Sequence, residues 1–298
     1  MTNEIKNLLY GKICSELDGL AQNVVANYQA NMVNRENNPF LLFENESSKK
    51  YMALGRSIDS QLGNRLQRII FYIARMKYGM AHVPNIVEIN IIDQTAKNIE
   101  CVLYSVDCEL PLAEQKQGFN PYRQYVYINN HSTECQIKHS LKIKTRSTAL
   151  NKLTFSFNGI PQETMNFLIT NNKKKLPVDL LFFNCSMTEL NEANAFEIKM
   201  GGNLDTKNAE SNAREVKRLS DLFSFLQNRS AYFATCYGEC STAVKSNLEQ
   251  ILGRNAICNN RAFWNKIVPT NKFTYENFIS VYAEAFAATR LEERLNSL

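Results

Sequence analysis

Apolar residues near the N-terminus recur at intervals of three and four, which is the spacing of one face of a long helix. This stripe runs over residues 5–28. A second stripe of the same kind predicts another helix over residues 56–78. The Asn-rich stretch between them, residues 34–40, is typical of a linker.

The pattern changes to short segments between about residues 85 and 160. Each is rich in β-branched and aromatic residues and is bounded by polar breaks, which predicts strands. The run 178–183, apolar apart from Asp179, is typical of a central strand, and residues 195–200 read as the next strand after a polar loop. The five earlier segments are NIVEINII, IECVLYSV, YRQYVYINN, QIKHSLKI and KLTFSF.

The last third of the chain begins with a predicted helix that has Asp205 as its N-cap and continues to about residue 227. A strand over residues 231–238 follows, and the remainder is mostly helical. The order of elements predicts an α/β protein. We expect a single domain with an N-terminal helical addition (1–50), a core (51–238) and a C-terminal helical addition (239–298).

The composition is that of a soluble globular protein, with 298 residues, 44% hydrophobic and 21% charged. No apolar run reaches the roughly 18 residues of a membrane-spanning helix, and the N-terminus lacks a signal-peptide pattern. We therefore expect a cytoplasmic protein with no membrane partner. The net charge of +5 does not by itself predict nucleic-acid binding, although basic residues gather in 138–146 and 173–175.

Eight cysteines are scattered through a chain that is long enough to fold without disulfides, so we expect reduced and mostly buried thiols. Cys236 and Cys240 do not have CxxC spacing, and no second pair completes a zinc site. The three histidines are too dispersed for a His-rich metal site. These residues therefore do not favour metal chemistry based on sulfur or imidazole ligands.

The stretch AFEIKM places two charged side chains on one face of a strand, because side chains alternate and Glu197 and Lys199 are two positions apart. Asp179 lies eighteen positions before Glu197, and antiparallel pairing would bring the two carboxylates together. Two close carboxylates repel each other unless a cation lies between them. Oxygen ligands favour Mg²⁺, which polarises a phosphate and helps deprotonate water. Lys199 would neutralise the charge that develops on the phosphate.

Neighbouring residues allow two interpretations each. Gly201 and Gly202 either end the strand or allow a DNA backbone to approach. Asp205 is a helix cap or a metal ligand, and Asp59 is an exposed helical residue or a third carboxylate of the site. The general base cannot be assigned from these residues.

The motif PVD at 177–179 followed by FEIK at 196–199 resembles the PD-(D/E)XK nuclease superfamily, whose αβββαβ core is similar to the predicted order of elements. The segment EIKMGGNLDTKNA, together with the upstream helix GRSIDSQLGNRLQRI, is similar more narrowly to type II restriction endonucleases. The resemblance covers about residues 52–238. It implies a mixed sheet in the core, with Asp179 and Glu197 as metal ligands and Lys199 as the catalytic lysine.

The resemblance also implies Mg²⁺-dependent cleavage of double-stranded DNA at a short, usually palindromic site, leaving 5′-phosphate ends. A homodimer and a cognate DNA methyltransferase would be its partners in a restriction-modification system. Some relatives with similar EIK-GG-LD-K segments cut GGNCC-like sites.

Four further residues are candidate DNA contacts. Arg56, Ser57 and Asn64 lie on the polar side of the second helix, where they contact phosphate or face solvent. Lys207, in the first turn of the helix after the glycines, gains nothing from the helix dipole there and is a candidate phosphate contact. Segment 118–146 mixes Arg, Lys, Asn, Gln and His, as a groove-reading region or a decorated strand edge would.

Two other functions remain open from the sequence. The chain could be a PD-(D/E)XK nuclease of repair or recombination, which would recognise DNA structure and not a sequence. It could also be a non-catalytic DNA-binding protein in which Glu197 and Lys199 form only an ion pair.

Overall fold

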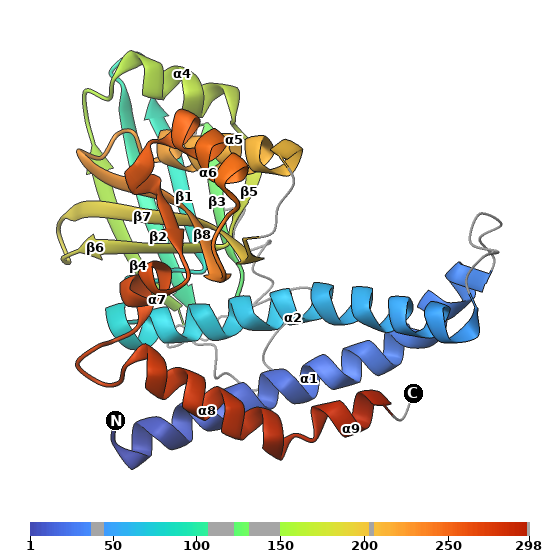
Figure 1. The fold of residues 1–298 in the computed structure, drawn as a ribbon. Helices are drawn as coiled ribbons and strands as arrows, with labels where there is room; N and C mark the ends of the chain where they lie inside the picture. The colour runs from blue at the N-terminus through green and yellow to red at the C-terminus, as the bar shows by residue number, and fades with distance from the viewer. Residues whose placement is uncertain (37–44, 107–121, 131–149, 203–205, 297–298) are drawn as a thin grey trace. The chain divides into compact units, whose positions relative to one another are not determined.

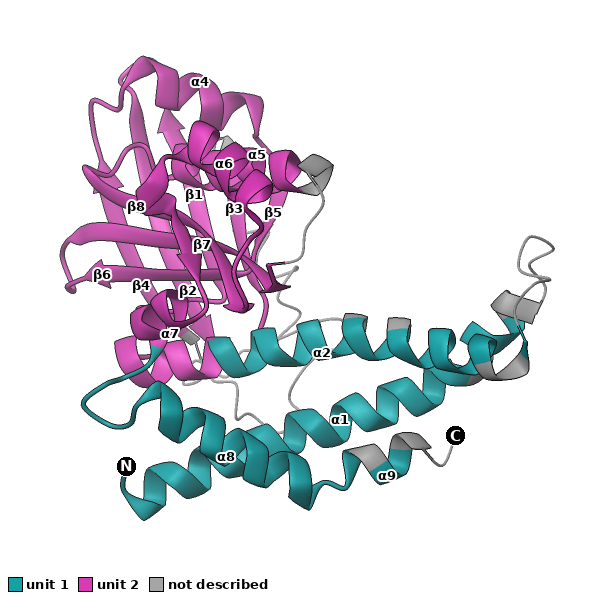
Figure 2. Cartoon of the chain, in the orientation of Figure 1, with its two compact units in different colours: residues 1–70, 268–298 teal, residues 71–267 magenta. Residues whose placement is uncertain are grey.

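A computed structural model of the protein describes residues 1–36, 45–106, 122–130, 150–202 and 206–296 (Figure 1). The chain divides into two compact units (Figure 2), which we call the helical unit (residues 1–70 and 268–298) and the sheet unit (residues 71–267). The elements combine mixed β-sheets with helical segments at both ends of the chain. This confirms the α/β class that the sequence predicts.

The helical unit contains two long helices and two C-terminal ones. The predicted stripe of the first helix is fully buried at Leu9, Ile13 and Leu17. The second helix begins ten residues earlier than predicted, because the Asn45 side chain accepts a hydrogen bond from the Ser48 amide and caps the helix there. None of the helices in the described ranges combines the length and the apolar character needed to cross a membrane. The four are α1 (Asn3–Glu36), α2 (Glu46–Tyr78), whose last turns belong to the sheet unit, α8 (Tyr275–Ala288) and α9 (Leu291–Asn296).

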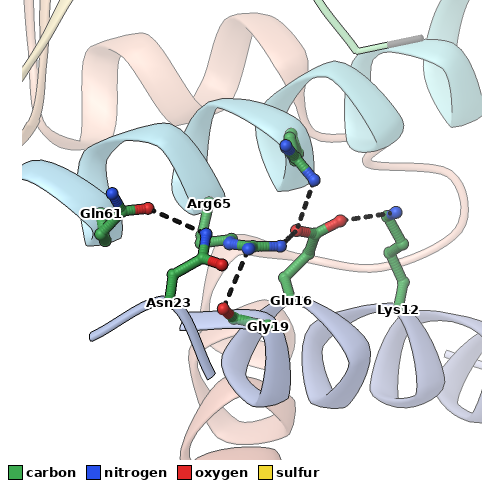
Figure 3. Close-up of polar contacts among 7 residues, drawn as sticks. Lys12, Glu16, Gly19, Asn23, Gln61 and Arg65 are labelled. Atoms are coloured by element: carbon green, nitrogen blue, oxygen red, sulfur yellow. Dashed lines mark hydrogen bonds and ion pairs between the residues drawn. The ribbon is translucent and has the colours of Figure 1, made fainter. Parts of the chain in front are cut away.

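A buried carboxylate connects α1 to α2 inside the helical unit (Figure 3). Glu16 is 3% exposed, and its two oxygens pair with Lys12 Nζ at 2.8 Å and with Arg65 Nη1 at 3.1 Å. Arg68 Nη1 lies 3.7 Å from the same carboxylate. The other terminal nitrogen of Arg65 donates to the Gly19 carbonyl at 2.9 Å. Opposite charges therefore compensate the desolvation of Glu16.

The first sheet of the sheet unit is mixed, since β1 pairs antiparallel with β2 and parallel with β3. Four of the five predicted segments between residues 85 and 160 correspond to its strands, and the segment QIKHSLKI lies outside the described residues. A helix not predicted from the sequence, α4 (Gln162–Thr170), precedes the last strand. The strand order is β4 (Leu150–Phe157), β2 (Asn98–Val106), β1 (Ile86–Asp93), β3 (Gln124–Asn130) and β5 (Lys175–Val178).

The second sheet begins with an antiparallel pair, β6 and β7, and continues with two parallel strands. Helix α5 (Thr206–Leu222) makes the crossover from β7 to β8, and α6 (Thr242–Leu252) and α7 (Arg261–Ile267) follow β8. The strand order is β6 (Leu180–Cys185), β7 (Leu190–Gly201), β8 (Asn228–Tyr237) and β9 (Ile257–Asn259).

The prediction of one central strand over residues 178–183 is wrong. The chain bends at Asp179, so that β5 belongs to the first sheet and β6 stands at the end of the second sheet in the described strand order. The apolar character of β6 has another origin, because its two faces are covered by different cores. Leu181 and Phe183 join the core shared by the two sheets, and Phe182 stacks on Tyr78 at the end of α2.

Candidate functional site

Asp179 and Glu197 are brought together by the antiparallel pairing of β6 and β7. Leu180 lies opposite Phe196, which places Asp179, one residue earlier, at the level of Glu197. The Asp179 carboxylate accepts a hydrogen bond from the backbone N–H of Ile198 through Oδ2 at 2.8 Å. The antiparallel pairing expected from the sequence is therefore present, and it places Asp179 and Glu197 at the same level of the two strands.

The bend at Asp179 is fixed by a buried side chain from the first sheet. Gln124, 1% exposed, accepts from the Leu181 N–H at 2.7 Å and donates to the Leu181 carbonyl, also at 2.7 Å. Its amide nitrogen also donates to the Pro84 carbonyl at 2.6 Å. The Gln124 amide thus satisfies the backbone N–H and carbonyl of Leu181, as a neighbouring strand would do. It thereby fixes the position of the backbone two residues after Asp179.

Glu197 and Lys199 project from the same face of β7, as predicted. Lys199 Nζ donates to Glu197 Oε1 at 2.8 Å, and the side chains of Lys199 and Glu197 are 35% and 16% exposed. The ion pair is formed within one strand and is partly screened by solvent. It leaves the ammonium group next to the Glu197 carboxylate at a partly accessible place.

The register that presents these charges depends on an aromatic stack on the opposite face of the sheet. Phe196 is fully buried, and its ring stacks on Phe182 of β6 at 5.6 Å and on Tyr232 of β8 at 4.8 Å. A slip of one residue would expose Phe196 and bury Glu197 and Lys199, so the stack specifies which face carries the charges.

A thiol next to the site remains protonated. Burial raises the pKa of Cys236 to about 12, and the negative charge of Asp179 acts in the same direction. At neutral pH Cys236 therefore adds no charge to that of the two carboxylates.

The structure explains Gly202 without DNA. A Cβ atom at this position would lie 2.3 Å from the carbonyl carbon and oxygen of Glu239 and 2.6 Å from the backbone nitrogen of Cys240. Only a glycine allows these two backbone segments to approach so closely. At Gly201 a Cβ would instead lie 2.9 Å from the ring of Tyr237, which is a movable side chain.

The donor set suits Mg²⁺ in one mode of binding. The described residues contain no group of three or more His, Cys, Asp or Glu side chains that could enclose a metal ion. Mg²⁺ commonly uses one or two carboxylates and completes its shell with waters and substrate phosphate oxygens. Asp179 and Glu197 fit this mode, in which the protein supplies only part of the shell.

The other candidates lie elsewhere or are only partly described. Ser57 is buried on α2 in the helical unit, where Asn64 is half-buried and Asp59 is exposed. The structure does not describe the side chains of Arg56 and Lys207. Asp205 lies outside the described residues, and only residues 122–130 of the segment 118–146 are described. A DNA-contacting role for Arg56, Ser57, Asn64 and Lys207 stays a prediction.

Sequence reasoning missed Tyr237, which ends β8 opposite Gly201 and is 60% exposed. The signal was available, because alternation along the predicted strand 231–238 places Tyr237 on one face with Phe233 and Thr235. The pairing partner that locates this face next to Lys199 becomes known only from the sheet register.

Comparison of the chain with protein-family models, with curated proteins and with solved structures gave no match.

Proposed function

We propose that the protein is a Mg²⁺-dependent endonuclease that hydrolyses phosphodiester bonds of double-stranded DNA at a short palindromic site. In this proposal it is a type II restriction endonuclease with a PD-(D/E)XK core. The observation that carries the proposal is the meeting of Asp179 with Glu197 and Lys199 at the paired ends of β6 and β7.

Asp179 and Glu197 would hold the metal ion, each through a carboxylate that has two oxygens and room for several contacts. The ion, when bound, supplies polarisation of the scissile phosphate and a water of lowered pKa. The Ile198 N–H orients the Asp179 carboxylate in the free protein, so this ligand needs little rearrangement when substrate binds.

Lys199 acts on the substrate in this proposal. Its ammonium group, now 2.8 Å from Glu197, can donate to a phosphate oxygen or to the attacking water. It therefore offers a fixed positive charge where negative charge develops during hydrolysis.

The experiment is digestion of plasmid DNA in Mg²⁺ with the variants Asp179→Asn, Glu197→Gln and Lys199→Met. Each should lower the cleavage rate by about 10³-fold, since each removes several kcal/mol of charge stabilisation from the transition state. Glu192→Gln is the matched control, because it makes the same change on the same strand near its other end. Thermal unfolding of every variant checks that the fold is kept.

The wild-type digest also separates the three candidate functions. Discrete fragments support the site-specific endonuclease, and their sequenced ends give the recognition site. Nicking that follows ends or branches would replace it by a repair or recombination nuclease. Binding without cleavage in Mg²⁺, or wild-type rates in Glu197→Gln, would refute the catalytic proposal.

Replacing Mg²⁺ by Ca²⁺ should support binding without cleavage, because the looser coordination of Ca²⁺ positions water less well.

A palindromic site presents two equivalent scissile bonds, so we propose a twofold-symmetric homodimer that places one site at each bond. Light scattering with and without cognate DNA tests this, and a monomeric mass in both would contradict it.

If Lys207 contacts phosphate, Lys207→Ala should weaken binding to cognate and random DNA alike. It should also make the log–log salt slope shallower by about one unit.

A further inference from the structure

The end of β8 presents an exposed aromatic side chain beside the candidate site. Lys199 of β7 pairs with Thr235 of β8, and Gly201 pairs with Tyr237. Because side chains of a strand alternate, Tyr237 lies on the same face as Lys199 and roughly 7 Å further along the strands. Its side chain is 60% exposed.

The backbone on both sides of Tyr237 is held firmly. The Trp264 indole N–H donates to the Cys236 carbonyl at 2.8 Å. On the other side, the fully buried Thr235 hydroxyl donates to the Gly238 carbonyl at 3.0 Å. A rigid backbone that carries an exposed aromatic ring is the arrangement expected of a binding residue and is not required by the core.

The ring lies over the end of β7. A Cβ atom on Gly201 would lie 2.9 to 3.0 Å from the hydroxyl end of the ring, so the phenol occupies the space that a side chain at residue 201 would fill. The hydroxyl group lies at the end of the strand that carries Glu197 and Lys199.

We propose that Tyr237 contacts the DNA backbone next to the scissile phosphate, donating its O–H to a phosphate oxygen while its ring packs on the deoxyribose. This inference rests on the proposed endonuclease function and adds a positioning residue to that site. A phosphate contact of this kind fixes the register of the DNA and reads no base. Tyr237 therefore acts on affinity and on the placement of the phosphate at Lys199.

The test measures binding by fluorescence anisotropy in Ca²⁺ and single-turnover cleavage in Mg²⁺ for Tyr237→Phe and Tyr237→Ala. Tyr237→Phe, which keeps the ring over Gly201, should weaken binding about tenfold, as expected for one hydrogen bond to a charged group. Tyr237→Ala should weaken it further. Both losses should be equal on cognate and random duplexes, and the salt slope should not change, because a neutral phenol releases no counterion.

Met187→Ala is the matched control, since this side chain is 79% exposed and lies in the turn at the opposite end of the β6–β7 pair. Binding by Tyr237→Phe and Tyr237→Ala that equals binding by Met187→Ala, in a protein that cleaves DNA, would overturn the role of Tyr237 and leave the endonuclease intact. A loss confined to the cognate duplex would overturn it in favour of base reading. A wild-type protein that neither binds nor cleaves DNA would overturn both proposals.

Discussion

Gly19 on α1 offers a direct test of the buried network around Glu16. A Cβ atom at this position would lie 2.4 Å from Arg65 Nη1 and 2.7 Å from the guanidinium carbon. Arg65 could swing away from an added methyl group, but it would then lose its bonds to Glu16 and to the Gly19 carbonyl. The cost of Gly19→Ala is therefore electrostatic more than steric.

Two opposing contributions set the effect of Gly19→Ala on the free energy of unfolding. Replacing glycine by alanine in a helix stabilises it by about 1 kcal/mol. A hydrogen bond to a charged group contributes about 1.5–3 kcal/mol, and little screening applies because the side chains of Arg65 and Glu16 are only 12% and 4% exposed. We expect Gly19→Ala to lower the free energy of unfolding of the helical unit by about 1–2 kcal/mol.

Gly11 is the matched control, because it lies on the same helix and a Cβ atom added there would have no atom of the described residues within 4 Å beyond its own stretch of helix. Gly11→Ala should stabilise the protein by about 1 kcal/mol. Urea unfolding followed by circular dichroism measures both variants. In an Arg65→Ala background the guanidinium is gone, so Gly19→Ala should become stabilising as well. Equal effects of Gly19→Ala and Gly11→Ala in the wild-type background would refute the reasoning.

Three further predictions concern the sheet unit. Gly202→Ala should destabilise it by about 1–3 kcal/mol in urea unfolding, since the added methyl meets backbone atoms that cannot rotate away. Gln124→Met keeps the side-chain volume but leaves the Leu181 N–H and carbonyl unpaired, so DNA cleavage and urea stability should both fall. The third follows from the pKa of Cys236, which is raised from 9.0 to about 12, so the folded state keeps a proton that the unfolded state loses. Stability should then fall as pH rises from about 9 to about 12, by up to about 1.4 kcal/mol per pH unit, and Cys236→Ala should remove this part of the fall.

The features that local periodicity controls could be predicted from the sequence. The buried stripe from Leu9 to Val24 follows from a period near 3.6, and the common face of Glu197 and Lys199 follows from a period of two. Both patterns depend on residues a few positions apart, so no knowledge of distant contacts is needed. The α/β class follows in turn from the order of these elements.

The break at Asp179 could not be read in this way. The run VDLLFF is apolar throughout except for Asp179 itself, and a continuous apolar run is what a single buried strand also shows. The chain changes sheet here because Gln124 satisfies both backbone groups of Leu181 from 57 positions away. A polar residue inside a predicted strand gives no sign that its side-chain amide will bond the backbone N–H and carbonyl of a distant segment.

The reason for Gly202 also could not be predicted from local sequence, and it changes the interpretation of the glycine pair next to the site. A glycine pair after a strand of charged residues invites an explanation through the ligand, but Gly202 is required by the protein's own backbone at Glu239 and Cys240. That contact closes the corner at which β7 and β8 end, and Tyr237 is presented from this corner. In the proposed endonuclease, Gly202 would therefore act on DNA binding only indirectly, because it holds in place the strand end that carries Tyr237 beside Lys199.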